Sequence, residues 1–182
     1  MAVIGWGKPK IYIKDLDASA PKWEELPTPV EDSTQLETTK GDKQEAKIEG
    51  GENEDVKYGK NTYALTFNIR AAKGRKRPIL DEDGVVAHNY AIALQPEDKE
   101  VQGFCMEKST VSVEDTFSAT DGGVWIYTFD ALKSSPDKKQ IQWGKIIVTE
   151  SAGNISKIEC DPEDTTGDED KFEIAPNPGV GG

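Results

Sequence analysis

The chain has 182 residues, of which 35% are hydrophobic and 31% charged, and its acids outnumber its lysines and arginines by enough to give a net charge of −12. This length suits one domain with appendages, and the low apolar content places part of the chain outside a core. So acidic a surface repels phosphate backbones, which argues against a protein that grips DNA but not against one that lets DNA slide past.

The N-terminal part predicts one strand and then a long polar segment. Residues 1–8 lack the basic start and long apolar stretch of a signal peptide, so we expect a soluble protein made in the cytoplasm, with no membrane partner. Lys10–Lys14 is the first strand candidate. Residues 15–42 are rich in Pro, Asp, Glu and Thr, with Trp23 and Leu26 as their main apolar anchors. They predict an extended loop.

The clearest strand follows this loop. In Asn61–Arg70 the residues Tyr63, Leu65, Phe67 and Ile69 share one face, while polar and small residues occupy the other, which is the two-residue period of a half-buried strand. Lys43–Glu49 is a weaker strand candidate. Residues 77–84 predict one short helix, with Pro78 in its first turn and Gly84 just past its end.

The second half of the chain continues with strands. The candidates are Tyr90–Leu94, Gly103–Lys108, Thr110–Asp115, Val124–Ala131 and Gln140–Thr149. Turn residues at Gly122-Gly123 and Ser134–Asp137 separate them, and we expect Val124–Ala131 and 139–150 to pair as a hairpin. Short strands at this spacing predict an all-β fold, a β-sandwich or half-barrel.

The strand at 124–131 has large side chains on both faces. Val124, Ile126 and Thr128 oppose Trp125, Tyr127 and Phe129. A strand of this kind is covered on both sides, so we expect the core on one face and a neighbouring subunit on the other. We expect Phe67 and Ile126 to lie in the core.

The acidic C-terminal extension, 151–182, follows the β domain of residues 1–150. Its composition is typical of disorder, although packing against another copy would order it. Ile155–Cys160 and Lys171–Ile174 are short strand candidates within it.

No catalytic, metal or cofactor site is predicted. The single histidine, His88, opens a strand without triad partners, and the acidic runs 161–164 and 168–170 do not match a calcium-binding loop. The glycine pairs lack a following Lys-Ser or Lys-Thr and read as turns. Cys105 and Cys160 have no metal or redox spacing, so we expect buried free thiols, while a single disulfide stays open.

One basic cluster stands out. Residues 70–77 hold five cations in eight positions, directly after the clearest strand. Interleaved aromatic residues and nucleic-acid motifs are absent. In so acidic a chain the cluster would bind an acidic protein surface of the same or a neighbouring subunit; a solvated loop is the alternative.

The stretch Gln35–Arg70 reads QLETTKGDKQEAKIEGGENEDVKYGKNTYALTFNIR. It has an acidic, Thr-rich lead, a charged strand ending in Glu49-Gly-Gly-Glu52, a short acidic link, and a strongly alternating strand. It resembles the core hairpin region of phage tail-tube (major tail) proteins, whose fold is shared with the tube protein of type VI secretion systems. The resemblance is best over 35–70 and weaker over 85–149.

The resemblance implies a β-sandwich or half-barrel with one short helix and an extended loop or hairpin within 15–57 that reaches neighbours. Six subunits would close into a ring, and stacked rings would form a phage tail tube in the virion. DNA would pass through the lumen without specific binding, and other tail proteins would be further partners. The expected inter-subunit contact residues are Arg70, Lys73, Arg75, Lys76, Arg77, Trp125, Tyr127 and Phe129.

Other functions stay open. The tube could belong to a type VI-like or contractile injection system. A carbohydrate-binding β-sandwich could stack sugar rings on Trp6, Trp23, Trp125 or Trp143. An enzyme with paired carboxylates is a third class, since acids are abundant. The strand face that would line a lumen is also open.

Overall fold

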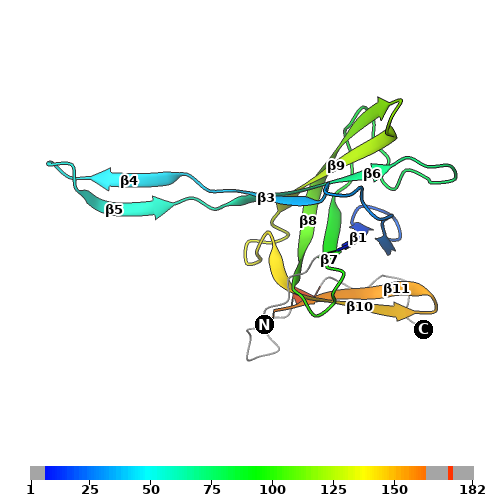
Figure 1. The fold of residues 1–182 in the computed structure, drawn as a ribbon. Coiled ribbons are helices and arrows are strands. Elements are labelled where there is room, and N and C mark those ends of the chain that lie inside the picture. The colour runs from blue at the N-terminus through cyan, green and yellow to red at the C-terminus, as the bar shows by residue number, and fades with distance from the viewer. Residues whose placement is uncertain (1–6, 163–171, 174–182) are drawn as a thin grey trace.

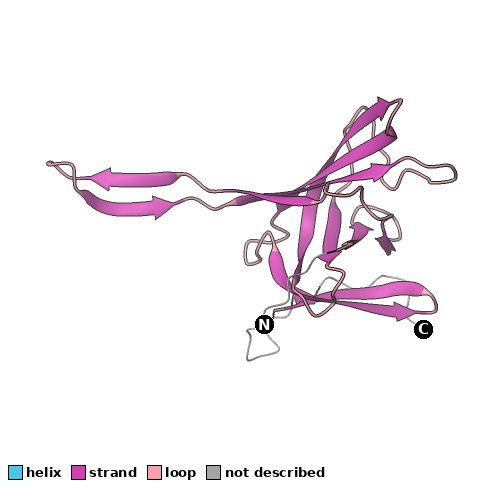
Figure 2. Ribbon diagram, in the orientation of Figure 1, coloured by secondary structure: helices cyan, strands magenta, loops and turns pink. Residues whose placement is uncertain are grey.

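The structure is a computed structural model and describes residues 7–162 and 172–173. The described part is all-β, with one ten-stranded antiparallel sheet and a separate two-stranded hairpin (Figures 1 and 2). No helix long and apolar enough to cross a bilayer occurs in it. The strands in chain order are β1 (Lys10–Asp15), β2 (Trp23–Glu25), β3 (Gln35–Thr39), β4 (Lys43–Lys47), β5 (Asn53–Tyr58), β6 (Thr62–Arg70), β7 (Tyr90–Gln95), β8 (Gly103–Ser118), β9 (Gly122–Leu132), β10 (Gln142–Ser151), β11 (Asn154–Asp161) and β12 (Phe172–Glu173).

The long strand β8 joins two layers of the sheet. Its first half pairs with β7 and β10, in the layer ordered β12-β11-β10-β8-β7-β1-β2. Its second half pairs with β9, in the layer β3-β6-β9-β8. The two layers are therefore one hydrogen-bonded sheet that folds over on itself, in a sandwich-like arrangement.

The main core lies between these layers. Phe67 stacks on Phe129 with ring centroids 5.5 Å apart and lies 5.8 Å from the ring of Tyr127, and all three side chains are fully buried. Ile92 of β7 and Met106 of β8 close the core from the other layer. The predicted alternation of β6, with its apolar face inward, is confirmed.

A second core covers the other face of the β1, β7 and β8 strands. Ala93 and Cys105 point to this face, and the β10–β11 hairpin packs onto it with Ile146, Ile158 and Cys160. All six residues of β7 are buried for this reason. Both cysteines are free and buried, and the packed part of the chain continues to Asp161.

The predicted helix at 77–84 is wrong. Glu82 and Val85 exchange two backbone hydrogen bonds around a two-residue turn, N···O 2.9 and 3.0 Å. The residues between them, Asp83 and Gly84, have φ of 51° and 86°, the left-handed conformations that an Asp-Gly hairpin turn requires. The side chain of Asp81 secures the turn by accepting a hydrogen bond from the Gly84 N–H at 2.8 Å.

Two predictions about pairing are also wrong. The strands expected at 103–108 and 110–115 are one strand, β8. The expected hairpin of 124–131 with 139–150 does not form, because β9 pairs with β6 and β8 and β10 pairs with β8 and β11. Both edges of β9 are therefore already paired, and β10 cannot pair with it. Of the C-terminal predictions, β11 and β12 match the two short strands, and residues 163–171 and 174–182 lie outside the described residues.

Candidate assembly surfaces

The most conspicuous feature is an arm, residues 40–61, that projects from the sandwich (Figure 1). It continues the β3–β6 pair outward as the β4–β5 hairpin, whose register runs from Lys43↔Tyr58 to Lys47↔Asn53. Every residue of both strands is exposed. A lone two-stranded hairpin is marginally stable in water, so the arm has the form of an element that is completed by packing on something else.

Two glycines, Gly41 and Gly59, approach each other closely where the arm leaves the body. A Cβ on Gly41 would lie 2.2 Å from the backbone carbonyl of Gly59, closer than real side chains approach a backbone. The Gly59 N–H donates to the Asp42 carbonyl at 2.8 Å, and the Gly41 N–H donates to Asn61 Oδ1 at 3.2 Å. Because Gly41 has no side chain, the two segments at the base of the arm can approach each other this closely.

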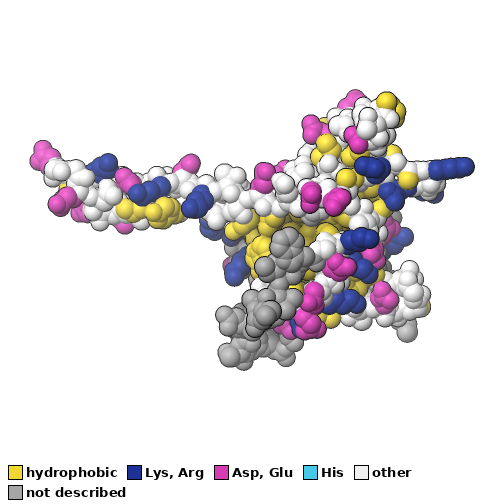
Figure 3. Space-filling view, viewed as in Figure 1, with side chains coloured by type: hydrophobic (Ala, Val, Ile, Leu, Met, Phe, Trp, Pro, Cys, Tyr) yellow, Lys and Arg dark blue, Asp and Glu magenta, His cyan; other side chains and the backbone are white. Residues whose placement is uncertain are grey.

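The arm presents a mixed apolar and charged face. Lys43 and Lys47 flank Glu45 along β4, and both form ion pairs with its carboxylate. Across the hairpin, Val56 and Tyr58 lie opposite Glu45 and Lys43, and 68% of Tyr58 is exposed. An exposed hydrophobic patch lies on one side of the arm, on the part nearer the body (Figure 3). This combination suits a protein contact.

The layer β3-β6-β9-β8 also has open edges. Among the described residues, strand β3 pairs with β6 on one side and has no strand on its other side. At the opposite edge, β8 pairs with β9 to its end, and the turn at Gly84 covers it only as far as Val113. Phe117 lies next to the last cross-strand pair of the β8–β9 hairpin and is 83% exposed. Unpaired edges of this kind are templates for another chain.

The outer face of the same layer is polar. Cross-strand rows on it join Asn68, Ile126 and Glu114, and one step further Thr66, Thr128 and Ser112. Neutral and acidic side chains predominate, and Arg70 lies at the end of the face. The expectation that Ile126 belongs to the core is wrong, because it shares this outer face and is only partly buried.

The predicted basic cluster is divided between two roles. Arg77 binds inside the subunit: it pairs with Asp81 at 2.7 Å and with Asp115, and its guanidinium lies 5.4 Å from the Trp125 ring centroid. Arg75 donates to the backbone carbonyl of Arg70 at 2.6 Å, within its own loop. Lys73 and Lys76 are exposed in the same loop, and their contact with a neighbouring subunit stays a prediction.

The predicted aromatic contact residues face inward. Tyr127 and Phe129 are fully buried and pack on Phe67. Trp125 is partly buried against the same core. Their side chains therefore contact their own subunit, and the outward face of β9 carries Val124, Ile126 and Thr128 instead.

His88 lies in the loop before β7 rather than in a strand. Its Nδ1 is 2.8 Å from Asp15 Oδ2 and its side chain is 47% exposed. The hydrogen bond to Asp15, together with the charge of that carboxylate, raises the pKa of His88. The pair ties the loop to the end of β1. Across the described ranges, no three His, Cys, Asp or Glu side chains converge as a metal site would require.

A cleft of about 830 Å³, lined by both apolar and charged residues, opens between the layers beside the β3 edge. Pro29, Leu36 and Phe104 line it together with Trp143, whose ring lies 5.1 Å from that of Phe104 and which is 48% exposed. Of the four tryptophans considered as sugar platforms, Trp23 is buried, Trp125 is covered by Arg77, and Trp6 lies outside the described residues.

Sequence reasoning missed the second strand of the arm. Residues 53–58 were expected to be an acidic link, since a strand exposed on both faces has no apolar alternation. The signal in the sequence is the Gly50-Gly51 pair between two polar stretches. In the structure these glycines have φ of 103° and 86°, the positive values that hairpin turns require. A scan against protein-family models and a search of curated proteins both find no match for this chain.

Proposed function

We propose that the chain is a structural subunit that assembles with copies of itself into rings, and that the rings stack into a tube of the phage-tail kind. The observation that carries the proposal is the fully exposed β4–β5 arm, which extends from a layer with open edges at β3 and at the end of β8 beyond Val113. Edges related by a rotation that closes give a ring, and an arm that reaches past its own body gives contact between subunits or rings.

The outer face of the β3-β6-β9-β8 layer suits the lining of such a tube. Its rows of Thr, Ser and Asn with Glu114 and Asp130 offer few cations to phosphates. DNA would then move along the face instead of binding it, the reverse of binding by counterion release. A ring of six subunits and a tube of a contractile or type VI-like system are variants of the same assembly.

A second function rests on Trp143. Its ring, which is exposed in the lining of the cleft beside β3, could stack on a sugar. Titration with a panel of glycans, followed by tryptophan fluorescence, tests this role. Saturable quenching that Trp143→Ala abolishes would favour a carbohydrate-binding module.

Negative-stain electron microscopy of the purified protein, with light scattering over a concentration series, tests the main proposal. We expect rings or tubes of uniform diameter, and scattering that rises with concentration faster than for a fixed species. A monomer at every concentration and salt condition would contradict it.

A further inference from the structure

A groove lined by lysines lies where the arm joins the body. Two segments form it: residues 59–63, which lead from the arm into β6, and the loop between β9 and β10. Its volume is about 460 Å³. Its lining residues are Gly59, Lys60, Asn61, Tyr63, Lys133, Asp137, Lys138, Lys139, Gln140 and Ile141. We call this site the lysine groove.

The groove concentrates positive charge in an acidic protein. The ammonium groups of Lys60 and Lys133 lie close together, and this close approach with its mutual repulsion lowers the pKa of Lys133. Lys133 donates to the Pro136 carbonyl at 3.2 Å, and Lys138 pairs with Glu107 at 2.8 Å. Asp137 is the one carboxylate among the lining residues. Like charges held together in this way are stabilised by an anion between them.

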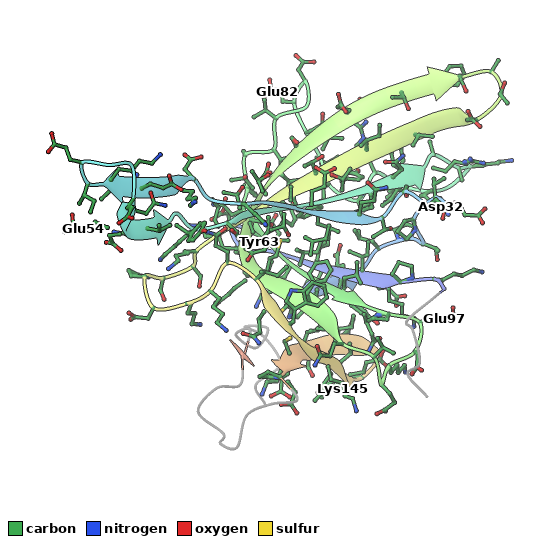
Figure 4. The ribbon with its side chains drawn as sticks, turned by 60° about the vertical axis from the view of Figure 1, so that its left-hand side comes forward. Asp32, Glu54, Tyr63, Glu82, Glu97 and Lys145 are labelled. Carbon is green, nitrogen blue, oxygen red and sulfur yellow. The ribbon has the colours of Figure 1, made fainter. Side chains whose placement is uncertain are left out.

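The tip of the arm carries the opposite charge. Residues 48–56, which we call the arm tip, contain Glu49, Glu52, Glu54 and Asp55 and no lysine or arginine. Within the described chain none of these four acids forms a salt bridge. In Figure 4, Glu54 lies far out on the arm, whereas Tyr63 of the groove lies where the arm meets the body. Each molecule thus carries an acidic surface at the arm tip and a positively charged surface, the lysine groove, where the arm joins the body.

The arm tip does not reach the groove of its own subunit. The hairpin ladder holds the strands extended, and the five residues of β4 alone span roughly 17 Å. Any contact between tip and groove must therefore join two molecules. A contact between two different surfaces can repeat head-to-tail from copy to copy, as the proposed rings and tube require.

We propose that the lysine groove is an anion site that takes the carboxylates of the arm tip of a second copy. This inference rests on the proposed function and adds to it the place where the arm docks. The tip supplies glutamates on both sides of the Gly50-Gly51 turn, and Lys60 and Lys133 would face them. Tyr63, partly buried at the groove wall, gives the docked turn an apolar and hydrogen-bonding surface.

Charge reversal on each side tests the proposal. The groove variant is Lys60→Glu with Lys133→Glu, and the tip variant is Glu52→Lys with Glu54→Lys. A combined variant has both pairs of changes and the same net charge as the parent. The control, Lys22→Glu with Lys99→Glu, changes the net charge as the groove variant does, at exposed positions away from the arm. Association is measured by sedimentation velocity at matched concentrations, with circular dichroism as a check of folding.

We expect the groove and tip variants each to weaken association about tenfold or more. The combined variant should recover most of the loss, and the control should match the parent. Groove and tip variants that associate like the parent, or a combined variant without recovery, would overturn the docking site while the assembled parent keeps the proposed function. A parent that never associates overturns both.

Nucleic acid is the competing anion. Titration of the parent and the groove variant with a labelled single-stranded oligonucleotide separates the two. Under the proposal the oligonucleotide binds both proteins equally weakly. Tight binding that the groove variant loses, with association unchanged, would assign the groove to phosphates instead.

Discussion

Phe67 contacts the two other large aromatic residues of the core, Tyr127 and Phe129. Because it is fully buried, Phe67→Ala should lower the free energy of unfolding by about 3–5 kcal/mol through lost burial and a cavity. Ile126→Ala, on the neighbouring strand but on the outer face, should cost about 1 kcal/mol or less. Denaturant unfolding of the two variants measures both. Equal losses would contradict the assigned faces of β6 and β9.

His88 gives the loop before β7 a dependence on pH. Asp15 raises the pKa of His88 in the folded state. The pair therefore stabilises the fold fully below the unfolded pKa of about 6.5, and the contribution is lost as the pH rises through the higher folded pKa. NMR titration of the His88 ring should give a pKa above that of a free histidine, and Asp15→Asn should remove the increase. An unchanged pKa in Asp15→Asn would show that another group causes the shift.

At the scale of the elements, Gly41 decides whether the arm can extend. Gly41→Ala would place a Cβ 2.2 Å from the Gly59 carbonyl, so the backbone must separate there. The body should keep its free energy of unfolding to within about 0.5 kcal/mol, while association falls. Gly59→Ala is the control, since its Cβ meets the Asp42 nitrogen at a milder 3.2 Å. Sedimentation and denaturant unfolding of both variants separate the effects; equal association would exclude a special role for Gly41.

The cations of the loop 71–77 should likewise fall into two groups, one that stabilises the subunit and one that contributes to association. Arg77→Glu removes the ion pair with Asp81 and places a third carboxylate beside Asp81 and Asp115, so the subunit should lose stability, by roughly 3 kcal/mol or more. Lys73→Glu with Lys76→Glu should leave the unfolding transition unchanged and weaken association. Thermal unfolding and light scattering test both. A stable Arg77→Glu subunit would show that the internal contacts of Arg77 are of little energetic importance.

A strand with one buried face is the element that the sequence predicts most directly, although β4, exposed on both faces, and β7, buried on both, are also among the predicted strands. The alternation of Leu65, Phe67 and Ile69 predicts β6 because a two-layer core selects every second residue. Strand β5 has no such face, and the helix predicted at 77–84 fails because Asp83-Gly84 favours a hairpin turn. The lysine groove is invisible in the sequence, since Lys60 and Lys133 are brought together only by the sheet.

At the scale of the whole molecule, the body buries its apolar side chains, whereas the elements that project from it expose apolar side chains and unpaired backbone. Two cores account for nearly all the buried apolar side chains. The arm, the β3 edge and the β8–β9 tip carry Tyr58, Phe117 and unpaired backbone into solvent. We expect the net charge of −12 to keep the chain soluble despite these surfaces, and we propose that copies of the chain cover them.

Sedimentation velocity over a wide concentration range measures most directly whether copies cover these surfaces. We expect a monomer of 19.9 kDa to give way to a large, defined species as concentration rises, with the arm protected from proteolysis in that species. A single monomer boundary throughout, with an arm that proteases cleave equally at every concentration, would contradict the account.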